Sequence, residues 1–377
     1  MGEKDNNKLS ANQAQRRKLI AGAGAAAVSA SIAPVAAQTD GPSESVRWGF
    51  VGTGSIARSM ARVVKQTSAA ELTAVSSRRL SSAQDFAAAN GASRAFDDWA
   101  AMAAWDGVDA IYIATPTSVR EEIAIVAARS GKHVLAEKPF ASAPSLQRIV
   151  AACQDNNVAF MDGTHFNHHP RTRAILERIG KQAQPPWSVS SAFQFGLTDR
   201  GNIRYNPKLE PMGALGDAGW YNMRAAATYL ANDSELAQTE AFIRRDRATG
   251  AVIGASGVLV FDSGATSTWN CGFDSGAVLM DLCISSAGSV VTVDNFLSQN
   301  GDGSADYRWR QGGFSDASGG DLVNVASTRS SSTHMFDQFA QLVADPTLRQ
   351  RSMDLSNRTQ QLLDAAWASA IGNEKKA

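Results

Sequence analysis

Cysteine is scarce in this chain, and its positive and negative charges cancel. Three cysteines occur among 377 residues, and 36 basic side chains balance 36 acidic ones, so the formal net charge is zero. Cys153, Cys271 and Cys283 lack metal-ligand spacing and lie in apolar segments, which predicts buried free thiols; a Cys271–Cys283 disulfide in an oxidising compartment is the alternative. With no basic run beyond the first twenty residues, the charge pattern argues against a nucleic-acid partner.

Long hydrophobic runs are also missing. The alanine-rich run from Ala21 to Ala33 is short and weakly apolar for a membrane span, and no later segment reaches the necessary length. Arg16 and Arg17 precede this run, and small residues suited to signal peptidase follow it. The pattern resembles a twin-arginine export signal. We therefore expect residues 1–37 to be removed, 38–45 to remain as a short arm, and the product to be periplasmic without a stable membrane anchor. An uncleaved anchor and a chance alanine-rich helix are the alternatives.

A glycine-rich turn follows the first predicted strand, residues 45–51. The sequence Gly-Thr-Gly-Ser-Ile-Ala is the G-x-G-x-x-A form of the dinucleotide fingerprint, and it opens a helix that runs to about Gln66. The first glycine permits the tight turn, the second lets the backbone approach a pyrophosphate, and the alanine lets helix and strand pack closely. The free N–H groups at the helix start suit phosphates. The candidate cofactor-binding residues here are Gly52, Gly54, Ser55, Ile56 and Ala57.

The second predicted strand, residues 71–75, ends in Ser76-Ser77-Arg78-Arg79. An NAD site needs an acid at this point to hold the ribose 2′-hydroxyl, and none is present. Hydroxyl and guanidinium groups suit a 2′-phosphate instead, because arginine binds phosphate in a bidentate manner. The pattern favours NADP over NAD, with Ser77, Arg78 and Arg79 as its contacts. A solvated helix start capped by Ser81 is the alternative interpretation.

Strands and helices alternate regularly as far as residue 162, which predicts an α/β Rossmann domain with a doubly wound parallel sheet over residues 46–162. The buried strand 108–114 is broken at Thr115-Pro116, and the strand 134–136 stops at Glu137-Lys138-Pro139. Proline restricts the residue before it, so Lys138 is held extended at the carboxyl end of a parallel strand, where such sheets bind ligands. Thr115, Pro116, Glu137 and Lys138 are therefore further candidate cofactor contacts.

From residue 188 onward, apolar and polar residues alternate in segments joined by Gly, Asp and Ser turns. This predicts an α+β domain over residues 163–350 with a large, open-faced, mostly antiparallel sheet, followed by a C-terminal helix in 351–377. The stretch 299–321, rich in Gly, Ser and Asp, is expected to be a long loop. The predicted strands cover residues 189–195, 241–245, 251–261, 265–273 and 290–296.

Two groups of polar residues in this second half are candidates for a substrate pocket. His165, His168 and His169 lie within five residues, but no cysteine or carboxylate stands at ligand spacing, so we expect no metal and regard His165 and His168 as pocket-lining residues. Asp217 and Tyr221 are four residues apart in a glycine-rich helix, which places both on one face. An N-cap aspartate and a core tyrosine are the structural alternative.

The order and spacing of these motifs resemble the glucose–fructose oxidoreductase / inositol dehydrogenase / MocA family over roughly residues 46–373. Within it, the Ser-Arg end of strand two and Asp-x-Gly-x-Tyr are closest to glucose–fructose and aldose oxidoreductases and to NADP-linked dihydrodiol or xylose dehydrogenases. The resemblance implies that Lys138 lies beside the nicotinamide and the reacting carbinol, that Tyr221 is the proton donor and acceptor, and that Asp217 orients substrate hydroxyls. It also implies that His168 contacts the substrate. A neighbouring ammonium stabilises a phenolate, so we expect Lys138 to lower the pKa of Tyr221.

This chain departs from the family pattern in two places. Members often carry Thr-Pro-Asn-x-x-His after the fourth strand, whereas this chain has Thr115-Pro116-Thr117 followed by Arg120. The arm 38–45 is also too short to cover a cofactor in the way that the longer arm of glucose–fructose oxidoreductase does.

Export and fold together predict a tightly held cofactor, because an exported NADP enzyme meets no recycled pool of soluble nucleotide. The expected activity is oxidation of an aldose at C1 to the lactone and reduction of a second sugar to an alditol, in a ping-pong hydride transfer. The alternatives are a dihydrodiol- or xylose-type dehydrogenase with exchangeable NADP, an NAD-dependent glycoside hydrolase of the same family, and a nucleotide-bound sugar sensor without turnover. The family also implies a homo-oligomer, a dimer or tetramer, formed through the C-terminal sheet.

Overall fold

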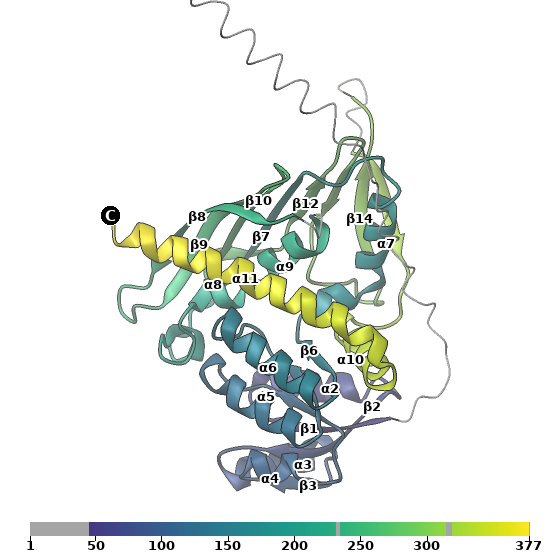
Figure 1. The fold of residues 1–377 in the computed structure, drawn as a ribbon, viewed down its shortest axis with the longest axis vertical. Helices are drawn as coiled ribbons and strands as arrows, with labels where there is room; N and C mark the ends of the chain where they lie inside the picture. Colours follow the sequence, from purple (N-terminus) through teal and green to yellow (C-terminus); the bar gives the residue numbers. More distant parts are fainter. Residues whose placement is uncertain (1–44, 231–233, 314–318, 377) are drawn as a thin grey trace, which may run out of the picture. The chain divides into compact units, whose positions relative to one another are not determined.

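The computed structural model describes residues 45–230, 234–313 and 319–376 (Figure 1). The predicted export signal lies outside these residues. Residues 43–377 form one compact unit. Among the described residues, no helix combines the length and hydrophobicity of a membrane span.

The first half of this unit contains a parallel sheet of six described strands in the order β3-β2-β1-β4-β5-β6. Every neighbouring pair is parallel, and β1 lies between β2 and β4, so the order reverses at β1. This confirms the predicted Rossmann topology. The strands are β1 (Val46–Val51), β2 (Ala70–Ser76), β3 (Arg94–Phe96), β4 (Ala110–Ile113), β5 (His133–Ala136) and β6 (Phe160–Asp162).

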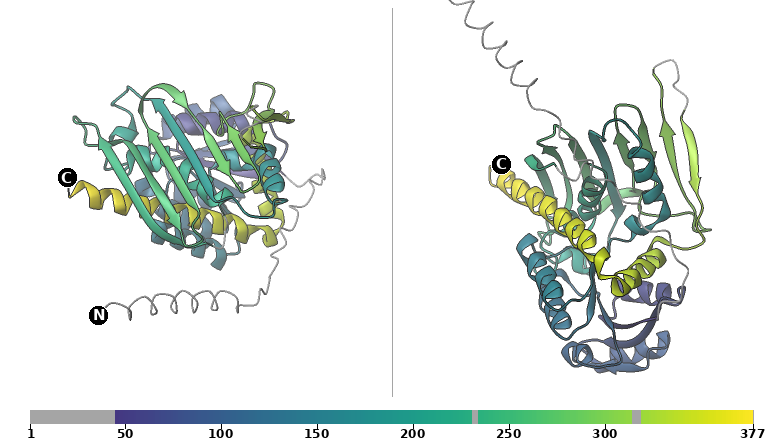
Figure 2. Two further views of the ribbon diagram at one scale, coloured as in Figure 1. Left: turned by 90° about the horizontal axis from the view of Figure 1, so that it is seen from above. Right: turned by 45° about the vertical axis from the view of Figure 1, so that its right-hand side comes forward.

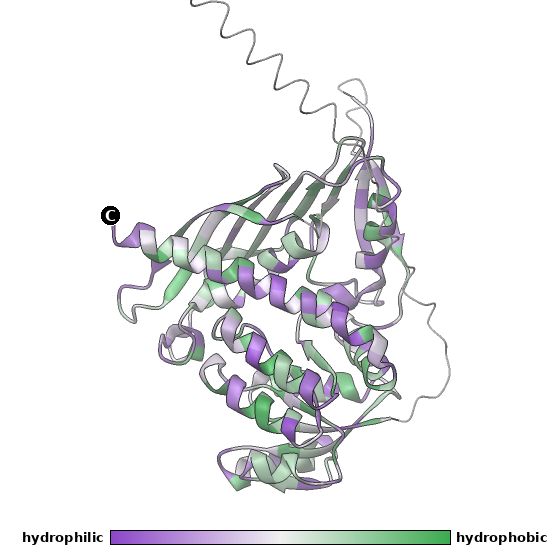
Figure 3. Cartoon of the chain, viewed as in Figure 1, coloured by the Kyte–Doolittle hydropathy of each residue, from purple (hydrophilic) through white to green (hydrophobic). Residues whose placement is uncertain are grey.

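Helices cover both faces of this sheet, as the continuous apolar runs in its strands require. In Figures 1 and 3, α5 and α6 lie side by side, each with alternating polar and apolar patches. Ser142 caps α6 by accepting a hydrogen bond from the N–H of Ser145, and Asp98 caps α4 in the same way through Ala100. The helices are α2 (Ser55–Val64), α3 (Leu80–Asn90), α4 (Trp99–Ala103), α5 (Arg120–Arg129) and α6 (Ala143–Asp155).

A helix from the far end of the chain completes one of these layers. Helix α10 (Ser331–Ala344) packs Phe336 and Phe339 against Trp48 of β1, with ring centroids 5.0 and 4.8 Å apart. The last helix, α11 (Arg349–Glu374), contacts α6 and β6 as well as β8 and α9, so it packs against both halves (Figure 1). A short 3₁₀ turn, η4 (Pro346–Leu348), joins α10 to α11.

The second half contains a mixed sheet of nine described strands, with the path β15-β14-β13-β12-β7-β10-β9-β8 and β11 beside β7. All of its pairs are antiparallel except β7 with β10, which confirms the predicted mostly antiparallel sheet. The strands are β7 (Ser188–Gly196), β8 (Leu236–Arg245), β9 (Val252–Phe261), β10 (Thr266–Gly272), β11 (Asp274–Leu279), β12 (Leu282–Ser285), β13 (Val290–Val293), β14 (Ala305–Arg310) and β15 (Asp321–Val325).

One face of this sheet is covered by helices and the other is open. The view from above in Figure 2 shows helices behind the strands, and none of the described helices lies on the near face. The covering helices include α7 (Pro170–Ile179), α8 (Gly213–Asp217) and α9 (Gly219–Tyr229), and the short 3₁₀ turns are η1 (Thr117–Val119), η2 (His165–His168) and η3 (Ile203–Tyr205).

The structure corrects two predictions from the sequence and decides between two alternatives for a third. The stretch 299–321 is not all loop, because β14 lies within it and buries Tyr307 and Trp309, which alternate with the half-buried Arg308 and the exposed Arg310. The helix expected to carry Asp217 and Tyr221 is two helices, α8 and α9, which meet at Ala218. Cys271 and Cys283 are free thiols. They pair with different residues of β7, one from each side of that strand, so the structure does not contain the alternative disulfide.

Candidate active site

The turns that follow the parallel strands meet at one edge of the sheet, and the candidate residues lie there. Gly52 has a φ of +108°, and a Cβ at this position would meet the carbonyl oxygen of Ala114 at 2.9 Å. Only glycine fits this turn without strain. A Cβ on Gly54 would meet nothing within 4 Å, so the space beside it is open. Gly54 caps α2 without a side-chain hydrogen bond, and Ile56 in the first turn of the helix is 41% exposed.

These features fit a dinucleotide. An open approach over Gly54 and an uncapped helix start suit a pyrophosphate. Thr115, after β4, has a buried Oγ1 with no hydrogen-bond partner among the described residues. Arg78 and Arg79 are exposed beyond the end of β2, beside the half-buried Ser77, with Arg79 Nε donating to Ser82 Oγ at 3.3 Å. A phosphate could therefore reach both guanidinium groups.

Lys138, Asp217 and Tyr221 come together although they belong to different elements. Lys138 follows β5, next to a cis peptide bond to Pro139, and its Nζ donates to the backbone oxygen and to Oδ1 of Asp217, both at 2.8 Å. The same Nζ lies 4.7 Å from the centre of the Tyr221 ring. Lys138 and Tyr221 are each 8% exposed. The three candidate residues from the sequence are therefore neighbours in the structure.

Arg204, which sequence reasoning missed, completes the ion pair. Its Nε donates to Asp217 Oδ2 at 2.6 Å and its Nη2 to Oδ1 at 3.1 Å, a bidentate contact from η3. Burial opposes ionisation of Asp217, but the Lys138 ammonium and the Arg204 guanidinium outweigh it, so the pKa of Asp217 lies below its ordinary value. Asp217 is thus a fixed carboxylate. No local pattern in residues 197–212 signals this arginine as an active-site residue.

The expected effect of Lys138 on Tyr221 is wrong for this structure. Burial raises the pKa of Tyr221 well above its ordinary value, and the Glu137 and Asp217 carboxylates raise it further. Two N–H groups of Lys138 are directed at Asp217, and its ammonium lies over the ring of Tyr221. Tyr221 is therefore a neutral phenol that can donate a proton.

Glu137, the residue before Lys138, is buried close to Lys138 and Tyr221. Its carboxylate accepts a hydrogen bond from the Tyr112 hydroxyl at 2.7 Å, and a Cβ on Gly163 would come within 2.8 Å of it. Burial raises the pKa of Glu137, partly offset by Lys138. Glu137 thus lies in a closely fitted, buried position between β4 and the turn after β6.

The two candidate histidines point to different neighbours. The His165 ring lies 5.8 Å from that of Tyr221, and burial, aided by Lys138, lowers its pKa to about 4, so it is neutral. His168 instead contacts Gln338 of α10, with Nδ1 and Oε1 2.8 Å apart. His165 thus lies beside Tyr221, whereas His168 does not, and the roles of both histidines in substrate binding stay predictions. Among the described residues, no group of three or more His, Cys, Asp or Glu is placed to hold a metal ion.

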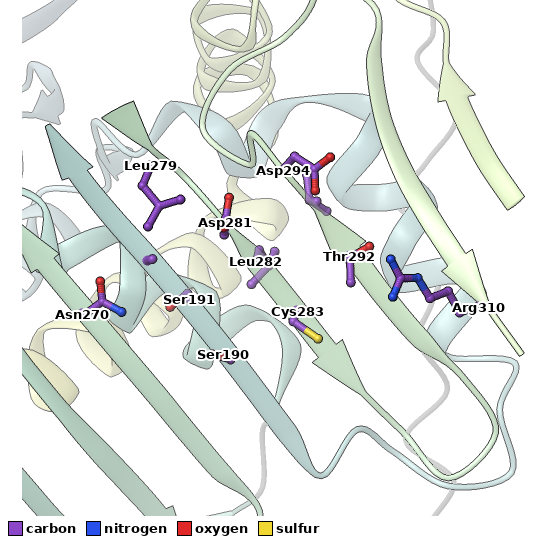
Figure 4. Close-up of a pocket in the computed structure, with 12 residues that line it drawn as sticks. Ser190, Ser191, Asn270, Leu279, Asp281, Leu282, Cys283, Thr292, Asp294 and Arg310 are labelled. Atoms are coloured by element: carbon purple, nitrogen blue, oxygen red, sulfur yellow. The ribbon is translucent and has the colours of Figure 1, made fainter. Parts of the chain in front are cut away.

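A depression lies on the open face of the nine-stranded sheet. It has a volume of about 430 Å³, and Figure 4 shows Asp281, Asp294 and Arg310 around it. Ser190 and Cys283, which pair across β7 and β12, also line it. Helix α9 packs on the opposite face of β7, so Tyr221 is on the other side of the sheet. The depression is separate from the candidate active site.

Comparison with known proteins agrees with this geometry. Residues 46–164 match the oxidoreductase family with an NAD-binding Rossmann fold, Gfo/Idh/MocA. A D-xylose 1-dehydrogenase (NADP(+)) from Haloferax volcanii is 32% identical over 229 residues, which is 60% of this chain and 69% of that protein. The chain belongs to the Gfo/Idh/MocA oxidoreductase family.

Solved structures show that this family fold extends over nearly all described residues. The 3-ketoreductase KijD10 from Actinomadura kijaniata, in complex with NADP and TDP-benzene, has a TM-score of 0.76 at 24% identity and covers 86% of this chain and 98% of that one. Aldose–aldose oxidoreductase from Caulobacter crescentus has a TM-score of 0.76 at 20% identity, covering 87% and 98%. At these identities the likeness shows the fold alone. The Gfo/Idh/MocA fold thus includes the second sheet as well as the Rossmann domain.

Proposed function

We propose that this protein is an NADP(H)-dependent sugar oxidoreductase that keeps its cofactor tightly bound. It oxidises an aldose at C1 to the lactone and reduces a second sugar to an alditol. The observation that carries the proposal is the contact of Lys138 with Asp217 and Tyr221 at the carboxyl ends of the parallel strands. Such an arrangement can move a proton to or from a carbinol oxygen, which hydride transfer requires.

NADP fits the residues at this edge. Gly52, Gly54 and the N-terminus of α2 would hold the pyrophosphate, and Ser77, Arg78 and Arg79 would hold the 2′-phosphate. When bound, the nicotinamide would supply the hydride acceptor and donor. Thr115, Pro116 and Glu137 line the turns next to Lys138 and are the remaining proposed contacts. The printed name of the Haloferax relative, which includes NADP(+), supports the choice of this nucleotide.

The protein side chains would handle the proton. Lys138 has three N–H donors and directs two of them at Asp217, which leaves one for a sugar oxygen. Tyr221, whose pKa is raised by burial, would give its proton to a carbonyl oxygen in the reductive half-reaction. In the oxidative half-reaction the carbinol proton returns to the same phenol oxygen. Asp217, held by Lys138 and Arg204, would orient the sugar hydroxyls.

The predicted export signal supports tight retention of the cofactor. We propose that residues 1–37 direct twin-arginine export to the periplasm, a route that moves folded, loaded proteins. A bound nucleotide that does not exchange must be reset by a second substrate, which gives ping-pong kinetics. N-terminal sequencing of periplasmic protein would test the signal: a start at Gln38 is expected, and an uncut protein retained in the cytoplasm would refute it.

We also propose a homo-oligomer formed through the open face of the nine-stranded sheet. Phe242 on β8 and Leu322 on β15 are 60% and 59% exposed. Residues that pair across neighbouring strands point to the same face of a sheet. Phe242 pairs with Ser256, and Ser256 pairs with Asn270, which lines the open-face depression. Leu322 pairs with Arg308 of the neighbouring strand β14. Large exposed apolar side chains on a broad face suit association. Light scattering of the purified protein should give a dimer or tetramer, and a monomer at micromolar concentration would contradict this proposal.

The deciding experiment is an absorbance spectrum of protein purified without added nucleotide, recorded before and after excess aldose. Reduced nicotinamide absorption should rise with one sugar and fall with a lactone or second sugar. A nucleotide-free protein that reduces added NADP⁺ would instead support the exchangeable xylose-type dehydrogenase suggested by the Haloferax relative. Release of a chromogenic sugar with added NAD⁺ would support the glycoside hydrolase.

A further inference from the structure

The loop between β7 and α8, residues 197–212, contacts the active site at two points. At the first, Arg204 binds Asp217 through two hydrogen bonds. At the second, Glu210 reaches the Rossmann half and accepts hydrogen bonds from Thr117 N at 3.1 Å and from Thr117 Oγ1 at 2.7 Å. Thr117 is 5% exposed and lies in η1, directly after β4. The loop therefore links the two halves across the edge where the cofactor is proposed to bind.

Arg120 extends this link to the residue that follows Lys138. Its Nη1 donates to Thr117 Oγ1 at 2.9 Å and also to the carbonyl oxygen of Pro139. Arg120 is 6% exposed, and its buried Nε has no partner among the described residues. A buried guanidinium is costly unless carboxylates lie close to it. Glu210 and Glu137 are near enough to favour its charge.

Together these contacts form a closed circuit of polar interactions around the site. It runs from Lys138 through Pro139 to Arg120, Thr117 and Glu210, returns along the loop to Arg204, and closes through Asp217 on Lys138. The circuit passes between the two halves twice. Thr117 and Arg120 are the two positions at which this chain departs from the Asn and His of the family pattern that it resembles.

We propose that Glu210, Thr117 and Arg120 form an inter-domain latch that holds the two halves closed over the bound dinucleotide. The inference rests on the proposed function, since it needs NADP(H) at the carboxyl ends of β1 and β4. Glu210 and Thr117 are positioning residues in this scheme. Their contact fixes the loop that presents Arg204 to Asp217, and Thr117 also accepts a hydrogen bond from Arg120, which holds the Pro139 carbonyl next to Lys138.

The latch explains how the cofactor is retained although the predicted arm 38–45 is short. The turn 115–117 follows β4, which is the neighbour of β1 and its glycine turn. A nucleotide bound over these turns would lie beside the Glu210–Thr117 contact, which joins the two halves there. Breaking that contact should therefore speed the release of the nucleotide.

The test measures NADPH release from full-length mature protein by fluorescence after a chase with excess NADP⁺. Thr117→Val keeps the volume and the backbone N–H but removes the hydroxyl that bridges Glu210 and Arg120. Thr117→Ser restores that hydroxyl. Ser118→Ala is the matched control, because Ser118 is the exposed neighbour in the same turn. Glu210→Gln tests the charge from the other half, where the substitution does not touch the Rossmann core.

We expect Thr117→Val to release NADPH roughly 10- to 100-fold faster, the range for losing a hydrogen bond to a charged group. Glu210→Gln should accelerate release in the same direction, and Thr117→Ser and Ser118→Ala should behave as wild type. Release at the wild-type rate in Thr117→Val and Glu210→Gln would overturn the latch alone. Equal acceleration in Thr117→Val and Thr117→Ser would also overturn it, since the hydroxyl would not matter. Wild-type protein that binds no nucleotide would overturn the proposed function, and the latch with it.

Discussion

The buried ion pair of Asp162 and Arg224 joins the end of β6 to α9, the helix that carries Tyr221. Arg224 Nη2 donates to Asp162 Oδ2, and the two side chains are 4% and 2% exposed. Ser356 Oγ donates to the same oxygen at 2.5 Å, and Thr164 N donates to the other at 3.0 Å. The carboxylate is thus satisfied from three directions. We predict that Asp162→Asn destabilises the protein strongly.

The magnitude follows from what the substitution leaves behind. Asparagine nearly keeps the shape of aspartate but leaves the Arg224 guanidinium buried without a counter-charge. Removing one partner of a buried pair costs about 3–5 kcal/mol in free energy of unfolding. Removing both charges, as in Asp162→Asn combined with Arg224→Met, should recover much of that loss. The matched control is Glu121→Gln, because the Glu121–Arg148 pair is at the surface, where solvent screens it and its loss should hardly change the stability.

Urea unfolding, followed by circular dichroism, would measure these differences through the transition midpoint. A loss below about 1 kcal/mol in Asp162→Asn would refute the reasoning, as would additive losses in the double variant.

The effect also has a defined pH dependence. Burial raises the pKa of Asp162, but Arg224 and the hydrogen bonds of Ser356 and Thr164 bring it below its ordinary value. The stabilisation is therefore complete above the unfolded-state pKa, about 3.9, and is lost as pH falls through the lower folded-state pKa. The difference between wild type and Asp162→Asn should shrink in that acidic range.

Three further predictions concern the site and its histidines. Lys138→Ala and Tyr221→Phe should each lower turnover about 100-fold or more, whereas Tyr307→Phe, on buried β14, should not; near-normal rates in the first two would remove these residues from catalysis. Arg78→Ala should weaken NADP⁺ binding about tenfold or more while leaving NAD⁺ binding unchanged, as measured by calorimetry, and equal losses for both would argue against a 2′-phosphate contact. Burial lowers the pKa of His133, His165 and His334 to about 4. The unfolded chain then binds more protons between about pH 4 and 6.5, so the free energy of unfolding should fall as pH is lowered through this window; a flat urea midpoint across it would contradict these shifts.

Features fixed by short-range sterics could be predicted from the sequence. The turn at Gly52 needs a positive φ and has no room for a Cβ. Only glycine meets both requirements, so the G-x-G-x-x-A motif alone predicts the turn. The strand β4 is buried throughout and reads as a continuous apolar run. Lys138 could be placed because a proline and a strand end specify its position locally. The Rossmann half followed from such signals.

Contacts between distant segments could not be predicted in this way. Glu210 and Thr117 are 93 residues apart, and neither lies in a periodic segment that would reveal a partner. Arg204 lies in an irregular loop, where an arginine normally reads as a solvated side chain. Strand β14 is a different case, because Tyr307 and Trp309 alternate with Arg308 and Arg310. This alternation of apolar and polar residues predicts a strand, but the Gly, Ser and Asp residues around it favoured a loop.

Asp217 decides the charge balance of the site. It accepts two hydrogen bonds from Lys138 and two from Arg204. Burial first, and then the Glu137 and Asp217 carboxylates, raises the pKa of Tyr221, so its phenol stays protonated and available to a carbonyl oxygen. The reverse proton transfer needs the phenolate, which burial and the Glu137 and Asp217 carboxylates oppose although the Lys138 ammonium lies over the ring. A positive charge close to the phenol would favour that state. If a nicotinamide binds beside Lys138 as proposed, its oxidised form would supply such a charge and its reduced form would not. The acid–base state of Tyr221 is therefore expected to follow the redox state of the cofactor, which couples proton transfer to hydride transfer in each half-reaction.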